Sequence, residues 1–271
     1  MKPDNIHKLI LAGLSLNIGL ACNAVFTALS HTPTPMPPTP VLLPTATSAP
    51  LISQQVTLVT VPFDENNPGN NFPSYTITSQ TPQLIGSDDP HVQAFNQRLN
   101  ELVIKEVDNH RQNFQQLPIT HLSNGSFLAV AYTLVSQVGD FWSFKFDLSF
   151  YADTAAHPGS YSLTLNYDLG QGRELALNDL FLPNSNYLEM ISNYCTTQLS
   201  KQPYADSFFL EGAKPSLENY HSWNIAPNGL LVTFDVYQVA PYASGPQTVV
   251  VPFHELHAVI NPQGPLAMIA R

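Results

Sequence analysis

The chain has 271 residues, of which 44% are hydrophobic and only 11% are charged, less than half the charged share of about 25% in a typical soluble domain. Twenty acidic residues against ten basic ones give a formal net charge of −10, which excludes nucleic-acid binding through clustered Lys and Arg. The 15 Phe, 11 Tyr and 2 Trp exclude a wholly disordered chain and supply ample material for a core.

The N-terminus predicts an export signal. Residues 1–8 form a short basic segment, and an apolar stretch of the length of a signal-peptide core follows over residues 9–21. The next motif, Gly19-Leu20-Ala21-Cys22, resembles the bacterial lipobox, in which a small residue precedes a cysteine that is acylated. It departs from that pattern where Gly19 replaces the usual Leu. Cys22 is therefore the candidate lipidation site.

Three interpretations of this leader stay open. The chain is a lipoprotein anchored through Cys22, a secreted protein cleaved nearby, or a protein held by residues 9–29, which are long enough to span a membrane. Residues 1–29 are thus a signal peptide or a membrane anchor. All three interpretations predict that the rest of the chain lies outside the cytoplasm, either anchored to the cell membrane or secreted.

Residues 30–51 form a linker rich in Pro and Thr, with seven prolines between residues 32 and 50. Prolines at this density favour extended polyproline geometry, so residues 32–50 would span about 60 Å at ~3.1 Å per residue. The segment is either a stalk that lifts a domain from a membrane or a disordered linker whose length is unimportant.

A long helix is the clearest element of the folded part. Strands are predicted over residues 56–61 and 74–78, and Asp88-Asp89-Pro90 then has the acidic cap and first-turn proline of a helix start. Apolar side chains and one histidine recur at spacings of three and four up to a helix end near Leu117-Pro118. They are Val92, Phe95, Leu99, Val103, Val107, His110 and Phe114. This pattern predicts an amphipathic helix that covers a sheet.

A hairpin follows the helix. The apolar runs 126–137 and 141–152 are joined by Val138-Gly139-Asp140, the strongest hairpin signal in the chain. Alternation in the second run predicts one apolar face, made of Trp142, Phe144, Phe146, Leu148 and Phe150. The opposite face is predicted to be mostly solvent-exposed; it is made of Phe141, Ser143, Lys145, Asp147 and Ser149.

The remaining elements complete an α+β pattern. A strand over residues 160–167 precedes a second, shorter helix over 186–199, in which Cys195 is more readily a core residue than a reactive thiol. A meander of strands ends the chain, over 223–225, 230–237 and 248–253. The expected fold is mainly antiparallel, with two small subdomains, an N-terminal α+β subdomain over residues 52–152 and a C-terminal one over residues 153–271.

Catalytic and metal-binding motifs are missing from the sequence. No serine lies in a G-x-S-x-G elbow, and no phosphate loop or dinucleotide fingerprint is present. His254 and His257 are three residues apart, whereas the zinc motif H-E-x-x-H needs a spacing of four. His157 precedes a strand and is interpreted as a loop residue with a backbone hydrogen bond rather than as a catalytic base. We therefore predict no catalytic residues, no metal site, no cofactor and no enzymatic activity.

One loop could contact a ligand. Residues 234–246 form a strand that runs into a tight loop rich in Tyr, Pro and Gly, and its candidate contact residues are Tyr237, Tyr242 and Ser244. Tyrosine provides a large contact area at low entropic cost. The alternative is a bulge and turn whose tyrosines only cover the sheet edge.

Four segments of the C-terminal half resemble the C-terminal domain of the RsiV anti-sigma factor family: NYDLGQGRELALNDLF at 166–181, residues 234–237, APYASG at 240–245, and VPFHEL at 251–256. Residues 52–118 are similar to the smaller domain that precedes it there and in PdaC-type peptidoglycan deacetylases. The resemblance implies an extracytoplasmic α+β module, which in RsiV proteins is a receptor for lysozyme. We expect neither sigma-factor control nor deacetylation, because at most eight residues precede the apolar stretch and no deacetylase domain follows the module.

These observations predict a non-enzymatic binding or sensing module of the bacterial cell envelope. Its expected partner is a lysozyme-like protein, which as a basic protein would be attracted to the acidic chain, or a cell-wall glycan. The alternatives are an envelope polymer hydrolase and an accessory domain of peptidoglycan modification. A cleft that holds His157, His254 or His257 beside a carboxylate would favour the hydrolase.

Overall fold

The computed structural model describes residues 50–267 and residue 269. The chain divides into two units, Met1–Thr47 and Ser48–Arg271, and the account below concerns the second. The predictions for the leader, for Cys22 and for almost all of the linker lie outside the described residues.

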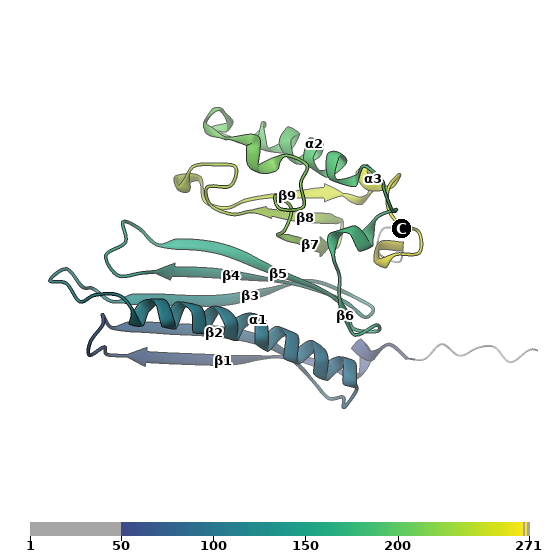
Figure 1. Ribbon diagram of the computed structural model, residues 1–271. Coiled ribbons are helices and arrows are strands. Elements are labelled where there is room, and N and C mark those ends of the chain that lie inside the picture. The colour runs from purple at the N-terminus through teal and green to yellow at the C-terminus, as the bar shows by residue number, and fades with distance from the viewer. Residues whose placement is uncertain (1–49, 268, 270–271) are drawn as a thin grey trace, which may run out of the picture. The chain divides into compact units, whose positions relative to one another are not determined.

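A six-stranded sheet forms the first layer of this unit (Figure 1). Its strands follow chain order: β1 (Thr57–Asn67), β2 (Tyr75–Ile85), β3 (Ser126–Val138), β4 (Phe141–Tyr151), β5 (Gly159–Asp168) and β6 (Arg173–Glu174). Neighbouring strands are antiparallel except β2 and β3, which are parallel because helix α1 (Pro90–Gln115) carries the chain back between them.

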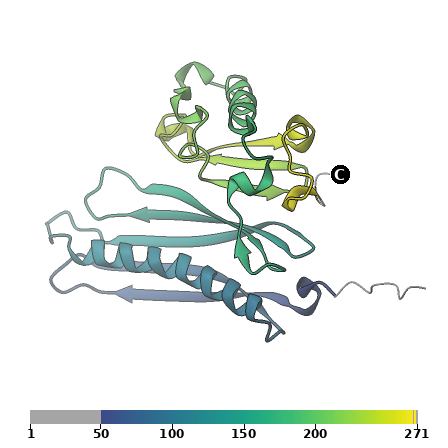
Figure 2. The same ribbon diagram turned by 45° about the vertical axis from the view of Figure 1, so that its right-hand side comes forward.

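A three-stranded antiparallel sheet forms the second layer, with the order β7 (Trp223–Ala226), β8 (Gly229–Phe234) and β9 (Gln247–Pro252). Helices α2 (Tyr187–Leu199) and α3 (Phe253–Leu256) lie on one side of it, and β3–β5 lie on the other (Figures 1 and 2). The predicted class, a mainly antiparallel α+β fold with one long and one shorter helix, is confirmed.

The structure confirms the helix start and the apolar stripe that the sequence predicts for α1. The Asp89 carboxylate accepts a hydrogen bond of 2.8 Å from the backbone N–H of His91, and Pro90 is the first helical residue. All seven residues of the predicted stripe are buried, together with Leu102. Phe95 contacts the rings of Trp142, Phe144 and Tyr167, so that α1 and the sheet share one apolar core.

The prediction of a solvent-exposed second face on β4 is wrong at one end of the strand. Phe141 and Ser143 are only 9% and 1% exposed, whereas Asp147 and Ser149 are exposed. The reason is β7, the edge strand of the smaller sheet, which lies against this face. The Ser143 hydroxyl accepts hydrogen bonds from the backbone N–H of Ile225 and from the Asn224 amide, at 3.1 and 3.0 Å.

The side chain of Asn166 on β5 makes the hydrogen bonds to the backbone of β7 that a neighbouring strand would otherwise make. Its amide donates to the Trp223 carbonyl at 2.8 Å and accepts from the Ile225 N–H at 3.1 Å. Ser136 on β3 donates to the Ile225 carbonyl. Side chains of the large sheet therefore satisfy the outer backbone edge of β7, which would otherwise be buried without partners.

The division into subdomains at residues 152/153 stays a prediction, but the two apolar cores of the structure part later in the chain. Residues 152/153 fall in the connection between β4 and β5, which pair along their length from Phe141–Asp168 to Phe150–Gly159. The core under α1 extends to Leu169, and the core around α2 and the small sheet takes over from Leu175, with Phe141 as its one member from the large sheet. Because β5 pairs with β4, the core under α1 continues past the loop between these strands and ends only after β5.

Cys195 lies in this second core, as its position on α2 predicts. It is fully buried, and burial raises the pKa of its thiol to about 12. A thiol that stays protonated and inaccessible is a packing residue rather than a nucleophile.

Candidate functional site

The predicted contact loop leaves the end of β8 and turns sharply. Tyr237 has a backbone φ of +66°, a left-handed conformation that is rare for a bulky residue, and its side chain is 55% exposed. Tyr242 begins a short 3-10 turn, and its hydroxyl donates to the Pro158 carbonyl at 2.9 Å. Tyr237 is therefore exposed at the surface of this loop.

The structure brings His157 to these tyrosines from 80 residues away. Its ring stacks on Tyr242 with centroids 4.1 Å apart, and its Nε2 lies 3.3 Å from the Tyr237 hydroxyl. The Tyr237 and Tyr242 rings are 5.7 Å apart. We call these three residues the aromatic cluster. His157 also makes the backbone hydrogen bond expected of a loop residue, with Nδ1 2.8 Å from the Pro158 carbonyl.

Ser244, the third predicted contact residue, contributes through its backbone. Its N–H donates to the Pro241 carbonyl at 2.9 Å, and its carbonyl accepts from the Gln247 amide at 2.8 Å. These bonds close the turn that carries Tyr242. Ser244 is exposed, but no contact joins it to the aromatic cluster, so its predicted role as a contact residue stays a prediction.

The histidines after β9 lie on the surface of α3 and its end. The His254 side chain is 79% exposed and stands 3.5 Å from Glu255, while His257 Nδ1 lies 2.7 Å from the His254 carbonyl. Within residues 50–267, no three metal-ligating side chains form a group that could hold an ion. The two histidines thus form neither a catalytic cleft nor a ligand set in the part of the chain that the structure describes.

A groove that the sequence did not reveal lies between α1 and strands β1 and β2. It has a volume of about 710 Å³, within the range of roughly 300–1,000 Å³ of small-molecule sites. Three large apolar side chains line it while remaining exposed: Val61 at 44%, Phe63 at 41% and Ile104 at 46%. We call it the α1–β1 groove.

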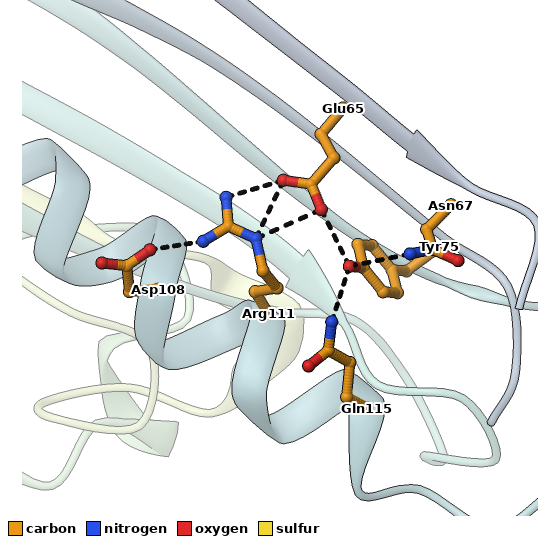
Figure 3. A network of polar contacts seen from close by, with 6 residues as sticks. All are labelled: Glu65, Asn67, Tyr75, Asp108, Arg111 and Gln115. Atoms are coloured by element: carbon orange, nitrogen blue, oxygen red, sulfur yellow. Dashed lines mark hydrogen bonds and ion pairs between the residues drawn. The ribbon is translucent and has the colours of Figure 1, made fainter. Parts of the chain in front are cut away.

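An ion-pair network lies beside one end of the groove (Figure 3). The Arg111 guanidinium donates to both carboxylate oxygens of Glu65 at 2.6–3.1 Å and also bonds Asp108. Tyr75 donates from its hydroxyl to Glu65 at 2.8 Å and accepts a bond of 3.1 Å from Gln115. The hydrogen bonds from Arg111 hold the pKa of Glu65 below its usual value, and those to Glu65 raise the pKa of Arg111.

Asn96 holds α1 against β2 nearer the start of the helix. Its side-chain amide accepts from the Leu84 N–H and donates to the Leu84 carbonyl, both at 2.8 Å. The parallel pairing of β2 with β3 ends at Ser79, so Leu84 has no backbone partner on that side. Asn96 and the Arg111–Glu65 pair therefore bracket the groove and fix the separation of helix and strand.

The α1–β1 groove was not predicted because the sequence analysis made β1 too short. The sequence predicted a strand ending at residue 61, whereas β1 continues to Asn67. Continued alternation would have put Val61, Phe63 and Glu65 on one face. That face is turned toward α1, because Glu65 binds Arg111.

Comparison with known proteins places this architecture among solved structures of one family of unassigned function. A member of the DUF3298 family from Bacteroides fragilis superposes with a TM-score of 0.63 at 16% identity, covering 80% of this chain and 97% of that one. A DUF3298 family protein from Pseudomonas aeruginosa superposes with a TM-score of 0.55 at 14% identity, covering 76% of this chain and 95% of that one. At these identities the likeness concerns the fold alone.

Sequence comparison agrees with the structural likeness. Residues 178–254 match the family model described as "Protein of unknown function (DUF3298)", so a DUF3298 domain is present. The peptidoglycan-N-acetylmuramic acid deacetylase PdaC of Bacillus subtilis is 25% identical over 168 residues. That match covers 61% of this chain and about a third, 36%, of PdaC. The comparisons support a DUF3298-type family and a relation to PdaC, without singling out the RsiV branch.

Membrane attachment was expected only from the leader, which the structure does not describe. Among residues 50–267, no helix combines the length and the apolar character needed to cross a bilayer.

Proposed function

We propose that this protein is a non-enzymatic binding module of the bacterial cell envelope, acting outside the cytoplasm, and that its ligand contacts the aromatic cluster. The observation that carries the proposal is the exposed Tyr237 side chain, held by a strained backbone beside His157 and Tyr242. Backbone strain of this kind concentrates at binding and catalytic sites. Exposed tyrosines whose conformation is fixed by neighbouring residues are typical contact residues in protein recognition.

The preferred ligand is a lysozyme-like protein. The chain's formal net charge of −10 would attract a basic partner over long range, and the aromatic cluster would supply the short-range contact. The resemblance to the lysozyme-binding ectodomain of RsiV supports the same choice. The export signal and the relation to a cell-wall-modifying enzyme support a location outside the cytoplasm.

A second candidate is an accessory domain of peptidoglycan modification, because the PdaC match covers a part of that enzyme. The hydrolase alternative rests on one contact: His221 lies 3.8 Å from the Asp235 carboxylate, and its interaction with that carboxylate raises the pKa of His221. Release of soluble fragments from purified peptidoglycan by the full chain would contradict the non-enzymatic proposal.

Calorimetric titration of the full chain with lysozyme at low and moderate salt tests the preferred ligand. We expect binding that weakens with salt, and a loss of about tenfold in affinity for Tyr237→Ala and Tyr242→Ala. Tyr204→Ala is the matched control, because Tyr204 also has a φ of +66° and is 86% exposed, and no ring contact or hydrogen bond among the described residues joins it to the aromatic cluster. Absence of binding at both salt concentrations would remove lysozyme as the ligand, and equal losses in all three variants would remove the aromatic cluster as its site.

A further inference from the structure

The α1–β1 groove combines apolar and neutral polar side chains in one place. Val61, Phe63 and Ile104 expose apolar surface into it. Exposed apolar side chains that gather in a concave surface mark ligand-binding grooves more often than isolated ones do. An apolar surface beside polar groups suits a ligand that is itself amphipathic.

Three polar side chains of the groove are neutral and make no side-chain hydrogen bond with the described residues. Thr81 and Gln83 on β2 and Asn100 on α1 line it and make no side-chain hydrogen bond with any residue that the structure describes. Hydroxyl and amide groups both donate and accept hydrogen bonds, so together they match a ligand rich in hydroxyl and acetamido groups.

The charges at the groove disfavour an anionic ligand. The charged side chains that line the groove are Asp108 and Arg111, and Arg111 is bonded to Asp108 and to both oxygens of Glu65. The three groups sum to one negative charge, so no free cation is available there for a phosphate or carboxylate. An anionic ligand would be repelled, and a neutral one would leave the network intact.

The groove is also pre-formed. Asn96 bonds the backbone of β2 and Arg111 bonds Glu65 of β1, so both walls are tied together without a ligand. Sites held in this way avoid much of the ordering cost of binding.

We propose that the α1–β1 groove binds a neutral oligosaccharide, with its apolar face on Phe63 and Ile104 and its hydroxyl and acetamido groups on Thr81, Gln83 and Asn100. The proposal rests on the proposed envelope function only for the source of the saccharide, a cell-wall glycan. It uses a surface different from the aromatic cluster, so each site can be lost without the other.

Calorimetric titration of the full chain with N,N′,N″,N‴-tetraacetylchitotetraose, a neutral probe, tests this. We expect binding that weakens by about tenfold in Phe63→Ala and in Asn100→Ala. The controls are Phe209→Ala, whose ring is also 41% exposed, and Asn109→Ala, an exposed asparagine of the same helix outside the groove. Both controls should retain affinity, and an anionic hyaluronan tetrasaccharide should bind at least about tenfold more weakly than the neutral probe.

The proposal would be overturned by no binding of the neutral probe, by equal loss in groove and control variants, or by binding of the anionic tetrasaccharide as tight as that of the neutral one. An extended apolar peptide that binds with a dependence on Phe63 while the saccharide does not would also overturn it and would identify β1 as an edge for strand addition. The lysozyme titration of Tyr237→Ala fails or succeeds independently, so failure of the saccharide proposal is distinguishable from failure of the proposed function.

Discussion

The two faces of the six-stranded sheet are covered in different ways. On one face α1 packs its apolar stripe against aromatic side chains such as Phe144 and Phe146, which are fully buried. On the other face Ser143 and Asn166 form hydrogen bonds with the backbone of β7. Hydrophobic periodicity in the sequence predicts the interface between α1 and the sheet. The interface between β7 and the sheet instead uses polar side chains, which a sequence pattern assigns to the solvent-exposed face.

The difference has an energetic meaning. Apolar packing tolerates changes that keep volume and loses free energy in proportion to what is removed. A buried hydrogen-bonded edge contributes little net free energy when complete, but leaves costly unpaired groups when one partner is removed. Substitutions on the two faces should therefore differ both in size and in additivity.

The largest effect is expected in the apolar face. Phe144→Ala removes a fully buried ring that contacts Phe95 and Trp142, and should lower the free energy of unfolding by about 3–5 kcal/mol. Urea denaturation followed by circular dichroism measures it. Phe63→Ala, at an exposed ring of the same sheet, should cost about 1 kcal/mol or less. Equal losses would show that the α1 core is not the main source of stability.

An intermediate effect is expected in the hydrogen-bonded face. Asn166→Leu leaves the Trp223 carbonyl without the bond it accepts from Asn166, and should cost about 2 kcal/mol. Ser143→Ala, which removes bonds to Asn166, Asn224 and Ile225, should cost a similar amount. The double variant should cost less than the sum by about 1 kcal/mol, because the two side chains share partners.

Additivity is the decisive measurement for that face. Ser149→Ala, an exposed serine of the same strand, is the control and should lie within about 0.5 kcal/mol of the parent protein. Strictly additive losses for residues 143 and 166 would mean that the two side chains act separately rather than as one network around β7.

The smallest effect is expected at the ion pair beside the groove. Arg111 lowers the pKa of Glu65, so the carboxylate stabilises the folded state above its ordinary pKa of 4.5, and this stabilisation is lost as the pH falls through the lower folded pKa. Glu65→Gln should cost about 1 kcal/mol at pH 7, reduced by the partial exposure of the pair, and nothing in strong acid.

Unfolding curves of the parent and Glu65→Gln proteins between pH 7 and acid conditions check this prediction. Glu101→Gln on α1 is the control, since its carboxylate accepts a bond from Gln97 and should lose little on neutralisation. A difference between the Glu65→Gln variant and the parent that persists unchanged into acid would assign the effect to packing rather than to charge.

Much of the fold was predictable because its signals are local. Asp89-Pro90 and the stripe from Val92 to Phe114 predict α1, and Val138-Gly139-Asp140 predicts the β3–β4 turn. The parallel pairing of β2 and β3 was not predicted, because it depends on where α1 returns the chain. The later division between the cores was missed for the same reason: β5 carries no local mark of its pairing with β4.

The candidate sites divide in the same way. A loop rich in Tyr, Pro and Gly indicated Tyr237 and Tyr242 as candidate contact residues, and their rings lie 5.7 Å apart in the structure. His157 could not be assigned to them, because 80 residues separate it from Tyr237 and only folding brings the rings into contact. The α1–β1 groove was not predicted from the sequence. Its walls are joined by contacts between Asn96 and Leu84 and between Arg111 and Glu65, and no residue spacing in the sequence predicts these contacts.

The sequence by itself determined the α+β class, the main amphipathic helix and the β3–β4 hairpin, since capping, periodicity and turn chemistry act between near neighbours in the chain. Only the tertiary structure decided which polar side chains are buried, where the two cores part and where a ligand could lie. The physical reason is that burial and hydrogen-bond satisfaction belong to pairs of residues. Ser143 and Asn166 are ordinary polar residues of a sheet surface until the edge of β7 requires their hydrogen bonds.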